Sequence, residues 1–107
     1  ITDSINIEII SLDDFIFKKK IFGIDLLKID TEGYEFSIIN GLLKNINKIK
    51  VIHFEHHYDD MVVKNYKFGD IHSLLIKNNF KQYFKIKMKF RKSFEYIYYN
   101  KSLINKK

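Results

Sequence analysis

The chain has 107 residues, of which 46% are hydrophobic, and a formal net charge of +6 at pH 7; this size suits one domain or a part of one. It contains no cysteine, which excludes a disulfide framework, a thiolate metal site and a thiol nucleophile, and which fits the reducing cytoplasm where we expect the protein. No apolar stretch approaches the roughly 20 residues of a membrane-spanning helix, so we expect no membrane span. Because the chain begins with Ile and not with Met, we expect residues 1–107 to form one partial domain of a longer protein.

A strand and a short helix are predicted at the start of the chain. Residues 5–9 alternate between apolar and polar side chains, which is typical of a half-exposed strand. Ser11 and Asp14 have the spacing of a capping box, in which an N-cap hydroxyl and an acidic residue three positions later open a helix. This helix extends toward Phe17, and the lysines at 18–20 complement the helix dipole at its end.

Two apolar runs on either side of a helical pattern predict a strand–helix–strand unit. Residues 24–30 and residues 49–55 each end in a carboxylate, Asp30 and Glu55. Such nearly continuous runs are typical of strands that are buried on both faces of a parallel sheet. Residues 34–44 carry apolar side chains at helical spacing. A right-handed crossover is expected to join the two strands.

The last third of the chain predicts a helix and a hairpin. Asp70 is expected to cap a helix that ends at residues 78–79, two asparagines suited to an αL terminus. Aromatic and β-branched residues in 83–88 and 94–99 predict an antiparallel hairpin. Residues 101–107 are expected to form a frayed tail.

Taken in order, these elements predict an α/β fold with parallel central strands. In open parallel sheets, ligands bind beyond the carboxyl ends of the strands. Asp30 and Glu55 should therefore lie at the same functional edge of one sheet. No Gly-rich phosphate or nucleotide loop follows any of the predicted strands.

Four segments carry a resemblance to a known family. They are Ser-Leu-Asp-Asp-Phe at 11–15, Ile-Asp-Leu-Leu-Lys-Ile-Asp-Thr-Glu-Gly-Tyr-Glu at 24–35, Ile-Ile-Asn-Gly-Leu at 38–42 and Ile-His-Phe-Glu at 52–55. In this order and spacing they resemble the FkbM family of S-adenosylmethionine-dependent methyltransferases. The Lys-Ile-Asp-x-Glu-Gly-x-Glu motif is the most specific part, because it is not generic Rossmann sequence.

The resemblance implies the C-terminal half of a Rossmann-like class I methyltransferase sheet, with parallel central strands and a terminal antiparallel hairpin. Residues 24–30 would be the fourth of seven strands and residues 49–55 the fifth, and the last strand would enter antiparallel. The glycine-rich, cofactor-binding half would lie before residue 1. The implied cofactor is S-adenosylmethionine. We expect O-methylation of a sugar or glycan hydroxyl, because similar family members often act on glycans or natural products.

Methyl transfer needs an acceptor held near the methyl group, and often a base for the leaving proton. Our hypothesis places Asp30 nearest the cofactor's methionine part and the acceptor. Glu32 and Glu55 would hydrogen-bond acceptor hydroxyls, and His57 is a candidate base. Gly33 would let the backbone approach closely where the helix begins. The simpler interpretations are a helix cap for Asp30 and a helix-dipole complement for Glu32. For Glu55 the simpler interpretation is a surface salt bridge, and for His57 a solvated loop position.

Four other polar residues have mainly structural interpretations. His53 lies within a predicted strand and is expected to be a packed histidine with a hydrogen-bonded ring. Lys28 interrupts a predicted buried strand, so we expect it to pair with a carboxylate, because burial of an unpaired charge is costly. Glu35 and Asp13 are interpreted first as helix-start residues.

A metal site is one alternative, because potential ligands crowd a segment whose residues 56–60 we expect to be loop. These ligands are His53, Glu55, His56, His57, Asp59 and Asp60, with Asp30 as a further candidate. Together they offer nitrogen and oxygen ligands of the kind that Zn²⁺ or Mn²⁺ takes. Their spacing matches no strong signature, so we expect no metal.

A basic binding module is a second alternative. Residues 61–107 carry eleven Lys and one Arg against two acidic residues, and such a surface attracts anionic partners. Basic and aromatic residues interleave here, as in nucleic-acid-binding surfaces: Lys81, Tyr83, Phe84, Lys85, Lys87, Lys89, Phe90, Arg91, Lys92 and Phe94. Alternation in a hairpin turns one of these sets inward, and the scarcity of Arg argues against base readout. We therefore expect no nucleic-acid partner. A non-catalytic, truncated remnant is the third alternative, and the oligomeric state stays open.

Overall fold

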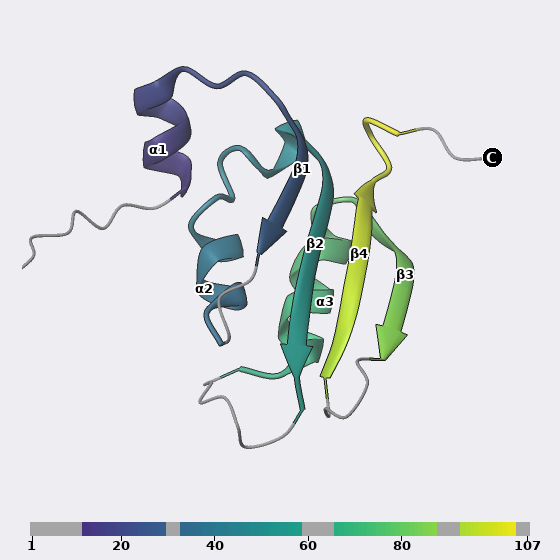
Figure 1. The fold of residues 1–107 in the computed structure, drawn as a ribbon. Helices are drawn as coiled ribbons and strands as arrows, with labels where there is room; N and C mark the ends of the chain where they lie inside the picture. Colours follow the sequence, from purple (N-terminus) through teal and green to yellow (C-terminus); the bar gives the residue numbers. More distant parts are fainter. Residues whose placement is uncertain (1–11, 30–32, 59–65, 88–92, 105–107) are drawn as a thin grey trace, which may run out of the picture.

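The computed structural model describes residues 12–29, 33–58, 66–87 and 93–104. The order of elements confirms the predicted alternation of helices and strands (Figure 1). The elements are α1 (Leu12–Lys19), β1 (Ile24–Ile29), α2 (Glu35–Asn40), the 3-10 turn η1 (Ile46–Lys48), β2 (Ile49–His57), α3 (Phe68–Lys77), β3 (Phe80–Lys87) and β4 (Ser93–Asn100). The strand predicted at residues 5–9 lies outside the described residues.

The strands form one mixed four-stranded sheet in the order β1-β2-β4-β3. β1 pairs with β2 in parallel, with Ile29 opposite Phe54. β4 is antiparallel to both of its neighbours, β2 and β3, so it is the one strand in the described sheet that runs against the others. The parallel pairing of the two apolar runs and the terminal hairpin are thus confirmed.

β1 was expected to be buried on both faces, and this prediction is wrong for the described sheet. β1 has a single neighbour there, β2. Asp25, Leu26 and Lys28 are exposed, and only Ile29 is buried. The exposure of Lys28 also removes the desolvation cost from which a carboxylate partner was inferred.

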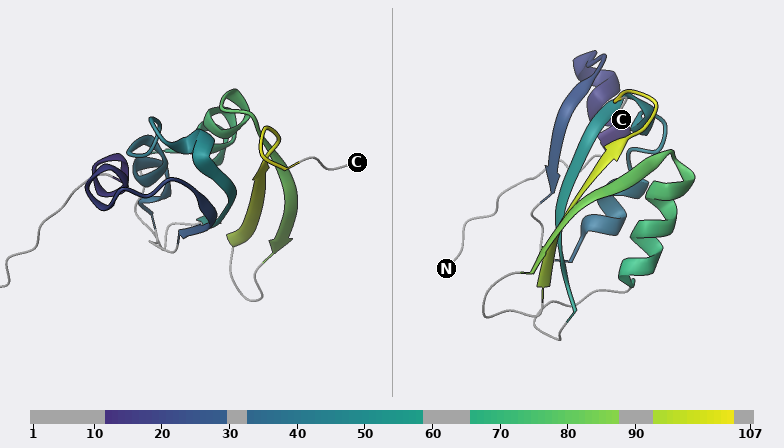
Figure 2. Two further views of the ribbon diagram at one scale, coloured as in Figure 1. Left: turned by 90° about the horizontal axis from the view of Figure 1, so that it is seen from above. Right: turned by 90° about the vertical axis from the view of Figure 1, so that its right-hand side faces the viewer.

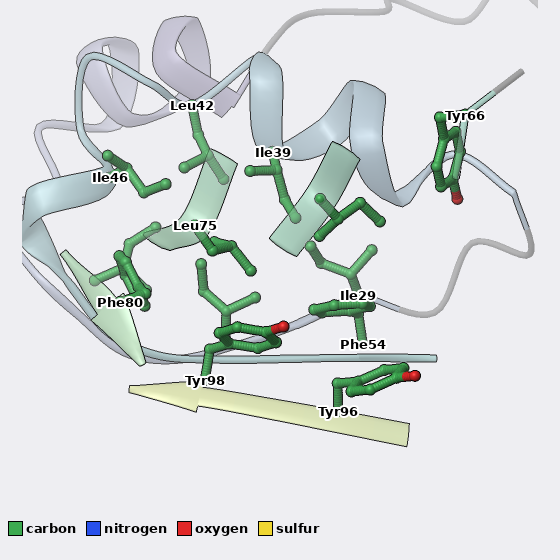
Figure 3. Packing of buried hydrophobic residues seen from close by; sticks show 13 residues of the cluster. Ile29, Ile39, Leu42, Ile46, Phe54, Tyr66, Leu75, Phe80, Tyr96 and Tyr98 are labelled. Carbon is green, nitrogen blue, oxygen red and sulfur yellow. The ribbon is translucent and has the colours of Figure 1, made fainter. Parts of the chain in front are cut away.

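The helices lie together on one face of the sheet, as the two views of Figure 2 show. Beneath them, Phe54 of β2 stacks with Tyr96 and Tyr98 of β4, with ring centroids 5.5 and 5.8 Å apart. Ile39 of α2 and Leu75 of α3 close over these rings with no exposed surface (Figure 3). Each such buried side chain contributes about 1.5–3 kcal/mol. The core therefore holds β2 and β4 rigidly at the centre of the described sheet.

The helix predicted over 34–44 is shorter in the structure. Helical backbone ends at Asn40, and the Gly41 N–H donates back to the carbonyls of Ser37 and Ile38. Asp13 of α1 then fixes the turn that follows, because its carboxylate accepts from the Lys44 N–H at 2.9 Å and from Asn45 Nδ2 at 2.8 Å. Asp13, interpreted first as a helix-start residue, thus also binds α1 to the turn after α2.

The C-terminal elements follow the prediction with small shifts. α3 begins at Phe68, and Asp70 accepts the Lys67 N–H at 2.8 Å from within the first turn, not from the N-cap position. Asn79 has the expected positive φ, 72°. Residues 101–104, expected to belong to a frayed tail, form a turn in which the Lys101 N–H donates to the Asn79 carbonyl at 2.9 Å.

Candidate functional site

The carboxyl ends of β1 and β2 mark one rim of the sheet, because the two strands are parallel. We call this edge the carboxyl rim. Asp30 and Glu32 lie outside the described residues, so their roles stay predictions. Glu55 and His57 are described, and both lie within the last three residues of β2.

β2 continues through His57, whereas residues 56–60 were predicted to be loop. The reason is a partner strand that lies far away in the sequence: β4 pairs with β2 down to the last residues, with Glu55 opposite Glu95 and His57 opposite Ser93. His56 and His57 are buried in this pairing, so for them the loop prediction is wrong. Asp59 and Asp60 lie outside the described residues.

Glu55, His57 and Ser93 form one cluster, which we call the rim cluster. Glu55 and His57 are two positions apart in a strand, so their side chains share a face. His57 Nε2 lies 3.3 Å from Glu55 Oε1, and the two side chains are only 6% and 14% exposed. Ser93 Oγ donates to the other carboxylate oxygen at 2.9 Å. Ser93 therefore hydrogen-bonds one carboxylate oxygen, and His57 lies within ion-pair distance of the other.

The geometry of the rim cluster suits proton handling. The approach of His57 Nε2 to Glu55 lies within ion-pair distance, but the nitrogen makes no hydrogen bond among the described residues. The arrangement thus places an imidazole nitrogen beside a carboxylate oxygen at the carboxyl rim.

Ser93 is a residue that sequence reasoning missed. It lies 38 positions from Glu55 and immediately precedes the residues from which the second hairpin strand was predicted. The pairing of β2 with β4 in this register is what brings it to the carboxylate. A predicted hairpin gives no register against a third strand, so the sequence carries no direct signal for this contact.

The histidines of β2 do not form a common metal site. The His56 ring lies on the helix-covered face, 4.7 Å from the Tyr58 ring and 5.7 Å from the Tyr66 ring. His53 pairs with Glu95 at 3.4 Å, in agreement with a partly packed histidine. Across the ranges that the structure describes, no three His, Asp or Glu side chains come together as ligands.

An aromatic groove opens beside the rim on the helix-covered face. It measures about 450 Å³ and is lined by His56, Tyr58, Tyr66, Lys67, Phe68 and Gly69. The hydroxyls of Tyr58 and Tyr96 are hydrogen-bonded to each other beneath it. Burial, and then this bond, raise the pKa of Tyr96 well above its ordinary value, so the phenol stays neutral.

Glu35 proves to be a buried carboxylate. It is the first residue of α2, as a helix-start residue should be, yet it is only 2% exposed. Its two oxygens accept the Gly33 N–H at 3.3 and 3.2 Å, and Oε2 also accepts the Tyr66 hydroxyl. Burial, and then the bond to Glu35, raise the pKa of Tyr66. Gly33 has φ 118°, a conformation that strongly favours glycine.

In the hairpin of β3 and β4, which carries the predicted basic binding module, one lysine contacts aromatic rings of the protein itself. Lys85 Nζ lies 4.5 Å from the centre of the Phe94 ring and 5.8 Å from that of Tyr96, which are cation–π distances. Phe84 is exposed. Residues 89–92 of the predicted basic module lie outside the described ranges.

Within the described part of the chain, no helix has the length and apolar character required to cross a bilayer.

Comparison with known proteins identifies the family. Residues 1–83 match the family model described as the methyltransferase FkbM domain. No curated protein and no solved structure matches the chain. The family match covers most of the sequence and includes every segment from which the resemblance was drawn. The chain therefore belongs to the FkbM methyltransferase family.

Proposed function

We propose that this chain is the C-terminal half of a Rossmann-like class I methyltransferase domain that uses S-adenosylmethionine to methylate a hydroxyl of a sugar or glycan. The observation that carries the proposal is the rim cluster, in which a partly buried carboxylate and a buried imidazole lie at the carboxyl end of β2 in a member of a methyltransferase family. The absence of cysteine from the chain supports a cytoplasmic location.

The sheet supports the assignment to this half of the domain. β1 and β2 take the places of the fourth and fifth strands. β4, the last strand in the sequence, lies between β2 and β3 and runs antiparallel to both. An antiparallel last strand is what the resemblance implied, and its presence supports the assignment.

The described residues fit the acceptor side of methyl transfer better than the cofactor side. The rim cluster offers a carboxylate, an imidazole and a hydroxyl, which are groups that bind and deprotonate an alcohol. No glycine-rich loop for a nucleotide occurs among the described residues. S-adenosylmethionine, when bound, supplies an electrophilic methyl group. Asp30 is the residue that we assign to its methionine part.

The roles at the carboxyl rim follow from position and chemistry. Asp30 is the next residue after Ile29, and Glu55 is the next after Phe54, the residue that pairs with Ile29. We assign Glu55 and Glu32 to the hydroxyls of the acceptor, and Asp30 to both the acceptor and the cofactor. His57 takes the proton that leaves the attacking hydroxyl, and Glu55 stabilises the resulting imidazolium. A positioned base of this kind accelerates a reaction by about 10²–10⁴-fold.

The test uses the full-length gene product, methyl-labelled S-adenosylmethionine and a panel of sugars and oligosaccharides. We expect calorimetric binding of the cofactor and transfer of label to at least one sugar hydroxyl. Asp30→Asn should lower turnover by roughly 10- to 150-fold, the equivalent of one charged hydrogen bond of about 1.5–3 kcal/mol. Asp25→Asn is the matched control, because this carboxylate is 88% exposed and pairs with Lys50 on the surface.

Two results would count against the proposal at different levels. Absence of both cofactor binding and label transfer removes the function itself. Label transfer that is unchanged in Asp30→Asn and in Glu55→Gln leaves the function but removes the assignment of these residues.

A further inference from the structure

Glu35 connects two segments that border the carboxyl rim. One of its hydrogen-bond partners, Gly33, lies between β1 and α2. The other, Tyr66, lies between β2 and α3. Both partners donate to the same carboxylate, although they lie 33 positions apart in the sequence.

The hydrogen bond between Glu35 and Tyr66 is held in place by burial and by ring packing. A carboxylate that is 2% exposed is costly to bury unless hydrogen bonds replace its water. The Tyr66 ring is held in place from two sides, by stacking on Phe36 at 5.6 Å and by the His56 ring at 5.7 Å. The Tyr66 hydroxyl therefore has little freedom to turn away from Glu35.

We propose that Glu35 and Tyr66 are positioning residues, whose hydrogen bond fixes Gly33 and the start of α2 relative to the residues that lead into α3. We call Gly33, Glu35 and Tyr66 the Glu35 latch. The proposal rests on the proposed function, because Gly33 directly follows Glu32 in the sequence and Tyr66 packs against His56, which lies between Glu55 and His57 of the rim cluster.

The Glu35 latch is adjacent in the sequence to the residues that we assign to the acceptor and the cofactor. Gly33 directly follows Glu32, and its N–H is the donor to Glu35. This hydrogen bond fixes the backbone at the residue that directly follows Glu32 in the sequence. Small displacements of catalytic groups lower the rate strongly, since reacting groups need near-attack geometry. Loss of the latch should accordingly lower turnover more than it weakens cofactor binding.

The experiment compares Tyr66→Phe with Tyr34→Phe in the full-length gene product. Tyr66→Phe removes only the hydroxyl and keeps the ring that stacks on Phe36. Tyr34→Phe removes a hydroxyl from a residue that is 67% exposed in the same region. The first measurement is amide hydrogen exchange, which reports local opening. We expect exchange at Gly33 to be at least about tenfold faster in Tyr66→Phe and within about twofold of wild type in Tyr34→Phe.

The second measurement separates positioning from stability. For Tyr66→Phe we expect kcat to fall about tenfold while the cofactor Kd stays within about twofold. The double variant Glu35→Leu/Tyr66→Phe should be no slower than Glu35→Leu alone, because either change removes the hydrogen bond between these two side chains.

Either of two results overturns the proposal. One is unchanged exchange at Gly33 in Tyr66→Phe, and the other is faster exchange with unchanged kcat. The exchange measurement requires no activity. If the wild-type protein transfers no methyl group, the proposed function fails, while faster exchange at Gly33 still supports the coupling of the two segments.

Discussion

Replacing Ser93 by Ala removes the hydrogen bond that Ser93 Oγ donates to the Glu55 carboxylate. Ser93 is 1% exposed, and its Oγ donates to Glu55 Oε2 at 2.9 Å. A hydrogen bond to a charged group contributes about 1.5–3 kcal/mol. The Glu55 side chain keeps 14% exposure, so water can replace part of the loss, and we expect a decrease of about 1–2 kcal/mol in the free energy of unfolding.

The same loss should appear in catalysis, because the freed carboxylate no longer has a fixed orientation toward His57 and the acceptor. About 1–2 kcal/mol corresponds to a fall in kcat of roughly 5- to 30-fold. The assays are chemical denaturation and methyl transfer, both in the full-length gene product. Ser73→Ala is the control, because Ser73 is exposed on α3. Unfolding and turnover that match wild type in Ser93→Ala would refute the reasoning.

Two further predictions concern the aromatic core. Phe54→Ala should lower the free energy of unfolding by about 3–5 kcal/mol, because Phe54 is fully buried between two tyrosine rings. Phe17→Ala is the control: Phe17 is 84% exposed, and its replacement should change the free energy of unfolding by less than about 0.5 kcal/mol. Similar losses in the two variants would contradict the core described here. Burial raises the pKa values of Tyr66, Tyr96 and Tyr98 above the ordinary 10.0. The folded state then binds these protons more tightly than the unfolded state. The free energy of unfolding should therefore be unaffected by these groups below about pH 10 and should fall above it. Denaturation curves between about pH 9 and 11 measure this, and a rise with pH would show the sign to be wrong.

Much of the fold was predictable because local patterns determined it. The two apolar runs gave a parallel pair of strands, and the aromatic and β-branched residues near the end gave the hairpin. The αL conformation of Asn79 followed from the residue type alone. The exposure of β1 was not predictable in this way. An apolar run indicates a strand, but the number of neighbouring strands depends on contacts with other parts of the chain.

The site was predictable in position and only partly in its contacts. The carboxylate at the end of β2 marked Glu55 from the sequence, and the spacing of two residues to His57 is visible there. The extension of β2 through His57 depends on its pairing with Ser93, a long-range contact that no local pattern encodes. Glu35 was assigned to a helix start because its position fits, whereas its burial and its hydrogen bond to Tyr66, which lies in another segment, have no signal in the local pattern.

The most direct test of the central claim is the turnover number of His57→Asn in the full-length gene product, compared with that of Asp25→Asn. Asp25 is a carboxylate on β1 that is 88% exposed and lies outside the rim cluster. If His57 takes the proton from the attacking hydroxyl, kcat for methyl transfer should fall by about 10²–10⁴-fold in His57→Asn. Asp25→Asn should stay close to wild type. Equal turnover in His57→Asn and the wild-type protein would contradict the account.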